Sequence, residues 1–212
     1  MHCILCLSTA LSPYHQDTKR AYWQCANCEL VTVEPDFWLT PDAERAEYDK
    51  HENSLEDVGY LKFLARAYQP VLNLVTAPAK GLDFGCGPAP ALAHHLNQQG
   101  YDVSYFDKFY FPDTATLEQT FDFITCTEVI EHLSTPRAVL TLFQQQTNPG
   151  GIWVIMTKRV ISLDAFRNWH YKNDPTHIAF YSDATFDWIA QHFKMTIIER
   201  QKDVVVLKDS TR

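Results

Sequence analysis

The feature that most restricts the fold is a short run at positions 81–90, Gly-Leu-Asp-Phe-Gly-Cys-Gly-Pro-Ala-Pro. An apolar segment that leads into closely spaced glycines, and then into a helical pattern, predicts a strand, a tight turn and a helix. Glycine suits such a turn because the backbone can adopt positive φ and approach a ligand without a Cβ atom in the way. The run therefore predicts an α/β fold that binds a ligand where this strand meets its helix.

From Lys80 onward, strand patterns and helix patterns alternate, which is typical of a doubly wound, Rossmann-like sheet with flanking helices. The expected strands cover 81–84, 103–106, 121–126 and 151–157, with a weak candidate at 114–117 and a final antiparallel pair at 195–199 and 204–207. The expected helices begin near Pro88, near Pro136 with Ser134 or Thr135 as its cap, and at Asp183 with Ser182 as its cap.

Three stretches differ in their residue patterns, and we expect each of them to be a structural unit. Residues 1–34 hold two cysteine pairs, 35–78 form a connector and a helix that could act as a lid, and 79–212 form the ligand-binding domain. In the second stretch, apolar residues at helical spacing begin at Val58, and Pro70 is expected to kink or end that helix.

Composition excludes several classes of protein. The chain has 212 residues, of which 46% are hydrophobic, and this is enough for one α/β domain and a small appendage. A net charge of −8 disfavours nucleic acid as the main partner. No run of about 18 apolar residues is present, so no membrane span is expected. Residues 1–12 lack the basic start of a signal peptide, so we expect a cytoplasmic protein with reduced cysteines.

The residues around the glycines discriminate between ligands. A dinucleotide site needs Gly or Ala where this chain has Pro90, and no Gly-Lys-Ser/Thr follows to form a phosphate-binding P-loop. Asp83 would repel a phosphate at the start of the helix. A sulfonium compound with an ammonium group and no phosphate suits this carboxylate better.

The run resembles motif I of class I S-adenosylmethionine-dependent methyltransferases, with Asp83, Gly85 and Gly87 in place and Ala89 where glycine is common. The resemblance implies that Asp107, twenty positions after Gly87, accepts hydrogen bonds from the ribose hydroxyls of the cofactor. Residues 121–133, FDFITCTEVIEHL, resemble the fourth-strand segment of the same family. The cofactor-binding residues implied in this way are Asp83, Gly85, Cys86, Gly87, Asp107, Thr127 and Glu128.

Within the same segment, His132 is expected to cap or pack a helix end. Cys86 and Cys126 are expected to be small buried residues rather than nucleophiles.

Two cysteine pairs predict a zinc ribbon. Cys3 and Cys6 form one Cys-x-x-Cys pair, Cys25 and Cys28 form the other, and eighteen residues separate the pairs. Four thiolates make a closed, tetrahedral and therefore structural Zn²⁺ site, which favours stability over catalysis. Some ribosomal RNA guanine methyltransferases resemble this layout, but their second pair usually ends in histidine.

The ribbon holds only Lys19 and Arg20 as basic residues. We therefore favour a lid or structural cap over an RNA clamp.

Two segments carry groups that could contact a substrate: residues 48–53 with Tyr60, and residues 169–182. Both resemble segments of a subset of bacterial small-molecule methyltransferases that also have a zinc ribbon. His177 and His170 are the candidate catalytic bases, because histidine titrates near neutral pH. The alternative is that both stabilise the loop, with Asp174 and Thr176 forming an Asx turn.

These observations favour an enzyme that transfers a methyl group from S-adenosylmethionine to a small-molecule acceptor by in-line displacement. One alternative is an RNA- or protein-directed methyltransferase that docks through the ribbon. Another is a non-catalytic zinc-ribbon binding module on a degenerate methyltransferase fold, which would account for Ala89 and for the absence of a recognisable adenine-binding turn.

Overall fold

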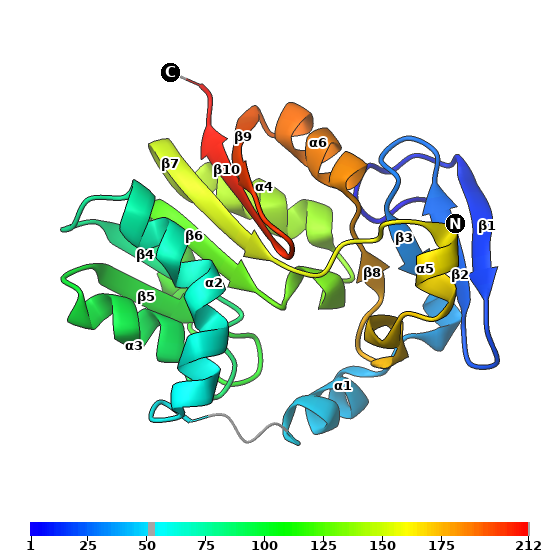
Figure 1. The fold of residues 1–212 in the computed structure, drawn as a ribbon, viewed down its shortest axis with the longest axis horizontal. Coiled ribbons are helices and arrows are strands. Elements are labelled where there is room, and N and C mark those ends of the chain that lie inside the picture. The colour runs from blue at the N-terminus through cyan, green and yellow to red at the C-terminus, as the bar shows by residue number, and fades with distance from the viewer. Residues whose placement is uncertain (51–53, 212) are drawn as a thin grey trace.

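A six-stranded sheet forms the centre of the molecule, with strand order β5-β4-β6-β7-β10-β9 (Figure 1). The computed structural model describes residues 1–50 and 54–211. Strands β5, β4, β6 and β7 are parallel to one another. Strand β10 runs antiparallel to both of its neighbours, β7 and β9. The strands are β4 (Lys80–Phe84), β5 (Asp102–Phe106), β6 (Phe121–Thr127), β7 (Thr147–Met156), β9 (Met195–Arg200) and β10 (Val204–Asp209). The predicted Rossmann-like α/β fold is confirmed.

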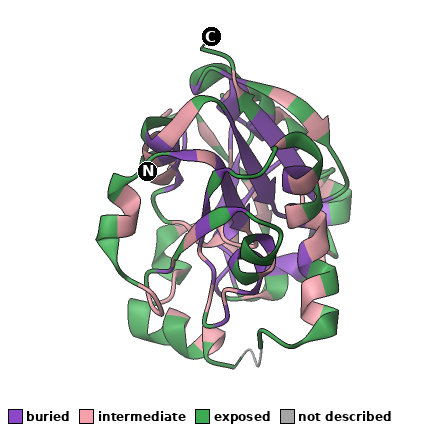
Figure 2. Cartoon of the chain, turned by 90° about the vertical axis from the view of Figure 1, so that its left-hand side faces the viewer, coloured by how far each residue is buried: buried purple, intermediate pink, exposed green. Residues whose placement is uncertain are grey.

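Helices cover both faces of this sheet because neighbouring strand residues point to opposite faces. Val154 and Met156 pack with α2 (Val58–Leu74) and α3 (Ala91–Gln98), whereas Trp153 and Ile155 pack with α4 (Pro136–Gln146) and α6 (Asp183–His192). The central strands β4, β6, β7 and β10 are mostly buried between these helices (Figure 2). The sheet therefore has two apolar cores, one on each face.

A second, four-stranded sheet has the order β1-β2-β3-β8. It comprises β1 (Leu11–Gln16), β2 (Ala21–Cys25), β3 (Val31–Val33) and β8 (Ala179–Phe180). The last strand comes from the segment that connects β7 to α6, so the N-terminal region and residues 179–180 form one sheet. Smaller elements are α1 (Pro41–Tyr48), α5 (Leu163–Arg167) and the 3-10 helices η1 (Pro35–Phe37), η2 (Thr114–Glu118), η3 (Ile130–His132) and η4 (His170–Asn173).

Some predicted elements need correction. The weak strand at 114–117 is wrong: these residues form η2, because the side chain of Asp113 accepts a hydrogen bond from the Ala115 N–H and starts a turn. The helix predicted near Pro88 begins at Ala91. The strand predicted from Gly151 begins at Thr147, and a bulge in its pairing with β6 accommodates the earlier start.

Helix ends agree in part with the sequence. Ser182 and Thr185 form the predicted cap of α6 reciprocally, each accepting a backbone N–H bond at 3.1 Å. Thr135 is the residue before α4, but its side chain makes no capping hydrogen bond. Pro70 does not end α2, which continues to Leu74. Among the described residues, no helix is both long and apolar enough to cross a membrane.

Candidate functional site

A cavity of about 540 Å³ lies at the carboxyl ends of β4, β5 and β6. In a doubly wound sheet this is where ligands bind, since the connections leave the central strands in opposite directions. Helices α1 and α2 form its outer walls through Tyr48, Tyr60 and Phe63. The cavity lining contains every residue that the sequence implied for the cofactor: Asp83, Gly85, Cys86, Gly87, Asp107, Thr127 and Glu128.

The glycine turn has the geometry that its sequence predicts. Gly85 and Gly87 have φ of +78° and +66°. A Cβ atom at Gly85 would lie 2.4 Å from Cγ2 of Val129, so no larger residue fits. A Cβ atom at Gly87 would meet no protein atom within 4 Å, which leaves open space for a ligand close to the backbone. Ala89 is buried beside this turn.

Asp107 connects two loops of the cavity. One carboxylate oxygen accepts the Gly87 N–H at 3.0 Å, and the other accepts the Phe109 and Tyr110 N–H groups at 2.8 and 3.1 Å. These three bonds fix the carboxylate at the end of β5. A carboxylate has about four acceptor sites, so one site, on the oxygen that accepts from Gly87, remains for a hydroxyl group of a ligand.

Asp83 lies at the floor of the same cavity, where it is 4% exposed. Thr125 donates to its carboxylate at 2.9 Å. Burial raises the pKa of Asp83 to about 6, and the charge of Asp107 adds to this rise. The carboxylate is therefore poorly solvated, and it would attract a cationic group that entered the cavity.

Cys86 is a buried cavity residue rather than a nucleophile. Its thiol donates to the Gly87 carbonyl at 3.4 Å, and burial raises its pKa well above the ordinary value. Cys126 is buried in β6, as expected.

A second group of acidic residues lies just after the carboxyl end of β6. Glu128 has φ of +52°, a left-handed conformation that is rare for a side chain other than glycine. The Tyr171 hydroxyl contacts both the Glu128 carboxylate, at 3.2 Å, and the Glu131 carboxylate. Glu131 is fully buried, and burial together with the Glu128 charge raises its pKa to about 8.

Two histidines meet at this end of the cavity. His132 and His177 both line it, and their ring centroids are 4.6 Å apart. Burial lowers the pKa of both, to about 3 for His132, so both rings are neutral at pH 7. The expectation that His132 only caps or packs a helix end missed this contact with the cavity.

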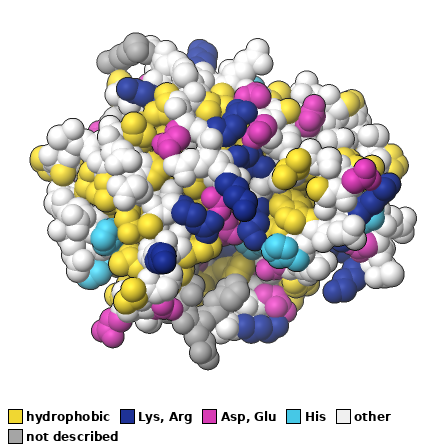
Figure 3. Space-filling view, viewed as in Figure 1, with side chains coloured by type: hydrophobic (Ala, Val, Ile, Leu, Met, Phe, Trp, Pro, Cys, Tyr) yellow, Lys and Arg dark blue, Asp and Glu magenta, His cyan; other side chains and the backbone are white. Residues whose placement is uncertain are grey.

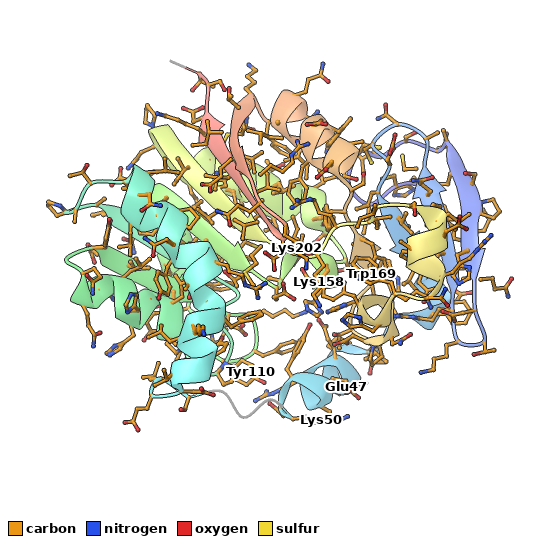
Figure 4. The ribbon with its side chains drawn as sticks, viewed as in Figure 1. Glu47, Lys50, Tyr110, Lys158, Trp169 and Lys202 are labelled. Carbon is orange, nitrogen blue, oxygen red and sulfur yellow. The ribbon has the colours of Figure 1, made fainter. Side chains whose placement is uncertain are left out.

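The other predicted base, His170, lies apart from this pair. It is exposed, 3.2 Å from the Lys158 ammonium group, and is not among the described residues that line the cavity. Lys158 and Trp169 lie on one side of the opening between the two sheets, with Tyr110, Glu47 and Lys50 on the other (Figure 4). Lysine and arginine side chains gather above a hollow on this face (Figure 3).

The structure also places the residues of the predicted substrate segments. Tyr48, Tyr60 and Asp174 line the cavity, whereas His51, Glu52 and Asn53 lie outside the described residues. The Asx turn is present, since Asp174 accepts the Thr176 N–H at 2.8 Å. Sequence reasoning did not identify Phe63 and Phe109, which are apolar cavity residues without a distinctive motif.

The four N-terminal cysteines converge at one point. The Cys3 and Cys28 sulfurs are 3.5 Å apart, and the Cys6 and Cys25 sulfurs are 3.4 Å apart. All four lie within 4.8 Å of one another. A tetrahedral Zn²⁺ site with bonds of about 2.3 Å places its sulfurs about 3.8 Å apart, so this donor set fits the ion.

Fold and cavity together define a class of protein. Its sheet is mostly parallel with an antiparallel end, a glycine turn follows the first strand of that sheet, and two acidic residues lie in one crevice. These are the features of a Rossmann-like class I methyltransferase.

Comparison with known proteins agrees with this class. Residues 51–199 match the model of a methyltransferase-domain family, and this chain belongs to that family. The ubiquinone biosynthesis O-methyltransferase of Salmonella enteritidis is 32% identical over 75 residues, which is 35% of this chain. That match spans only 31% of the length of the relative.

Two solved structures share the fold. One is a SAM-dependent methyltransferase from Archaeoglobus fulgidus, with a TM-score of 0.52 and 14% identity, covering 71% of this chain and 99% of the other. The second is a 1,6-didemethyltoxoflavin-N1-methyltransferase from Burkholderia thailandensis with bound S-adenosylhomocysteine. Its TM-score is 0.50 at 13% identity, covering 93% of this chain and 99% of the other.

Proposed function

We propose that this protein binds S-adenosylmethionine in the cavity and transfers its methyl group to a small-molecule acceptor. The observation that carries the proposal is that Asp83, Asp107 and the glycine turn line one cavity. Lys108 also lines it, but its ammonium group is 2.9 Å from the Glu44 carboxylate. The cavity is therefore suited to a cationic ligand rather than to a phosphate.

Each cofactor-binding residue has a role that its position supports. Asp83 would attract the ammonium group of the methionine part, and Asp107 would accept the ribose hydroxyls. Gly85 and Gly87 would allow the cofactor to approach the backbone. Cys86, Thr127 and Glu128 would flank it.

The acceptor would occupy the end of the cavity where His132 and His177 lie. Methyl transfer to an oriented acceptor depends mainly on positioning, and a base is needed only when the acceptor must lose a proton. His177 lines the cavity as a neutral imidazole, so we assign it the contact with the acceptor. His170 is exposed at the opening, and we assign it no direct contact.

We further propose that Cys3, Cys6, Cys25 and Cys28 bind a structural Zn²⁺ ion. The basic residue Arg20 of the predicted ribbon is 7% exposed and its guanidinium is directed inward, toward the carbonyls of residues 172–177. This burial removes one of the two basic groups with which the ribbon could have contacted RNA. It supports a ribbon that stabilises the acceptor side of the cavity.

Calorimetry with S-adenosylhomocysteine tests the cofactor site. We expect micromolar binding to the wild-type protein and a loss of at least about tenfold in affinity for Asp83→Asn, which removes the charge and keeps the shape. Asp102→Asn, an exposed residue of β5, is the matched control and should bind as the wild type does. Absence of binding, or equal affinity in Asp83→Asn, would overturn the placement of the cofactor.

A further inference from the structure

Three side chains form a cluster at the acceptor end of the cavity, and the proposed function uses only one of them, His177, as the contact with the acceptor. Glu131 and His132 come from η3, and His177 comes from the loop before β8. One ligand atom from each of them, two imidazole nitrogens and a carboxylate oxygen, lies within 4.8 Å of the others. Two imidazoles and one carboxylate are a donor set that binds divalent metal ions.

Both imidazoles are oriented as metal ligands are. Nδ1 of His132 is 3.1 Å from the Thr176 carbonyl, and Nδ1 of His177 is 2.7 Å from the Tyr171 carbonyl. A carbonyl only accepts, so each Nδ1 carries the proton and each Nε2 keeps its lone pair. A backbone carbonyl that holds Nδ1–H is the usual outer partner of a histidine that binds a metal through Nε2.

Glu131 provides an independent observation. Its side chain is fully buried, and the Tyr171 hydroxyl contacts only one of its carboxylate oxygens, Oε1. The other oxygen, Oε2, is buried and has no hydrogen-bond partner among the described residues. A buried carboxylate oxygen without a donor is costly, and a cation is the partner that would compensate it.

Nearby groups do not already fill this role. Nε2 of His177 is 3.8 Å from Oδ2 of Asp174, which is too long for a hydrogen bond. Lys158 lies over the Tyr171 ring, 5.0 Å from its centroid. Its ammonium group contacts His170 rather than Glu131.

We propose that Glu131, His132 and His177 bind one divalent first-row transition-metal ion. His132 and His177 both line the cavity, so the remaining coordination positions would face the acceptor. The inference rests on the proposed function in one respect, because it names the acceptor class: a molecule with a hydroxyl oxygen that coordinates the ion. A cation next to a hydroxyl makes it more acidic, so the proton can pass to water.

The methyl transfer then balances without a protein base. The acceptor O–H bond breaks and its proton passes to water. The oxygen forms a bond to the methyl carbon while the carbon–sulfur bond breaks, and that electron pair stays on the sulfur of S-adenosylhomocysteine. His177 in this scheme holds the ion that orients the acceptor oxygen.

Manganese binding to protein loaded with one equivalent of Zn²⁺ per chain, and freed of excess zinc, tests the site without any methyl transfer. Zn²⁺ fills the four thiolates first, because thiolate ligands select it over Mn²⁺. Mn²⁺ is then titrated, and its free electron paramagnetic resonance signal and the heat of binding are recorded. We expect one Mn²⁺ per chain, with affinity lowered at least tenfold in His132→Ala and in Glu131→Gln.

His94→Ala is the matched control, because His94 is exposed on α3 and its side chain contacts Gln98. It should bind Mn²⁺ as the wild type does. Circular dichroism and S-adenosylhomocysteine affinity verify that each variant is folded with an intact cofactor site. Absence of Mn²⁺ binding to wild type, or equal binding in folded His132→Ala, would overturn the metal site. Loss of cofactor binding with Mn²⁺ binding retained would overturn only the proposed cofactor site.

Discussion

At the scale of single residues, Asp83 combines a stability cost with its proposed role in binding the cofactor. Its carboxylate is held in a cavity where burial raises its pKa from the ordinary 3.8 to about 6. The folded state therefore binds this proton more tightly than the unfolded state does. Stability should fall as the pH rises from about 4 to about 6, and the cost should remain above that range.

Asp83→Asn should therefore stabilise the protein at pH 7.5 while it weakens cofactor binding. A rise in pKa from 3.8 to about 6 corresponds to about 3 kcal/mol, which is the upper limit of the expected gain in the free energy of unfolding. At pH 4 the gain should disappear, because Asp83 is then protonated in the folded protein. Urea unfolding at both pH values measures the difference. A variant less stable than wild type at pH 7.5 would contradict this account.

The sequence predicted cavity-lining residues where the signal is local and missed those that depend on distant partners. Asp83, Gly85 and Gly87 fall within one turn, so their types and spacing were sufficient. His132 was expected to be a packing residue because its partner, His177, is 45 positions away and only the fold brings them together. The exposure of His170 could not be predicted for the same reason.

At the scale of elements, the N-terminal sheet supports the loop that carries His177. The Arg20 guanidinium donates to the carbonyls of His177 at 2.9 Å, of Pro175 at 3.4 Å, and of Lys172. The Lys172 ammonium group in turn is 2.8 Å from the Asp17 carboxylate. The turn between β1 and β2 therefore fixes both the backbone and one side chain of the loop that carries His177.

Arg20→Lys should loosen this loop selectively, because lysine keeps the charge but lacks the planar, forked donors. Hydrogen exchange followed by mass spectrometry should show faster exchange for residues 171–178 and unchanged exchange for residues 80–87. The free energy of unfolding should fall by about 1–3 kcal/mol, since carbonyls lose their donors. Lys19→Ala, an exposed neighbour, is the control. Equal protection of residues 171–178 in wild type and Arg20→Lys would show that the loop is held by other contacts.

Elements with a continuous apolar pattern were predictable, and short or polar elements were not. Helix α1 has no buried residue, so it lacks apolar periodicity. Its residues fall in the predicted connector, and the structure shows that the Thr40 side chain caps the helix and that Pro41 occupies its first turn. Strand β8 has only two residues and pairs with β3 across nearly 150 positions, and no local pattern indicates such a pairing.

At the scale of the whole molecule, the sequence divides the chain at residue 34, but the packing crosses that boundary. Cys3, Leu5 and Leu30 are buried in the same apolar cluster as Trp153 and Phe186 of the large sheet and its helices. The Arg137 side chain, on α4, donates to the Leu5 carbonyl at 3.2 Å. The cysteine region therefore shares this cluster with the larger sheet, and Tyr22, Val31 and Val33 share a second cluster with residues 160–180.

This shared core predicts that removal of the proposed zinc ion destabilises the entire protein in one step. Without the ion, metal bonds no longer hold the four cysteines together, and about 34 residues cannot hold their own fold. Because the region packs into the common core, its loss should expose apolar surface on the large sheet. Calorimetric unfolding after chelation should show a single transition, lowered by about 10 °C or more, which Zn²⁺ restores. Two separate transitions, the larger one unchanged, would instead indicate that residues 1–34 are an independent domain.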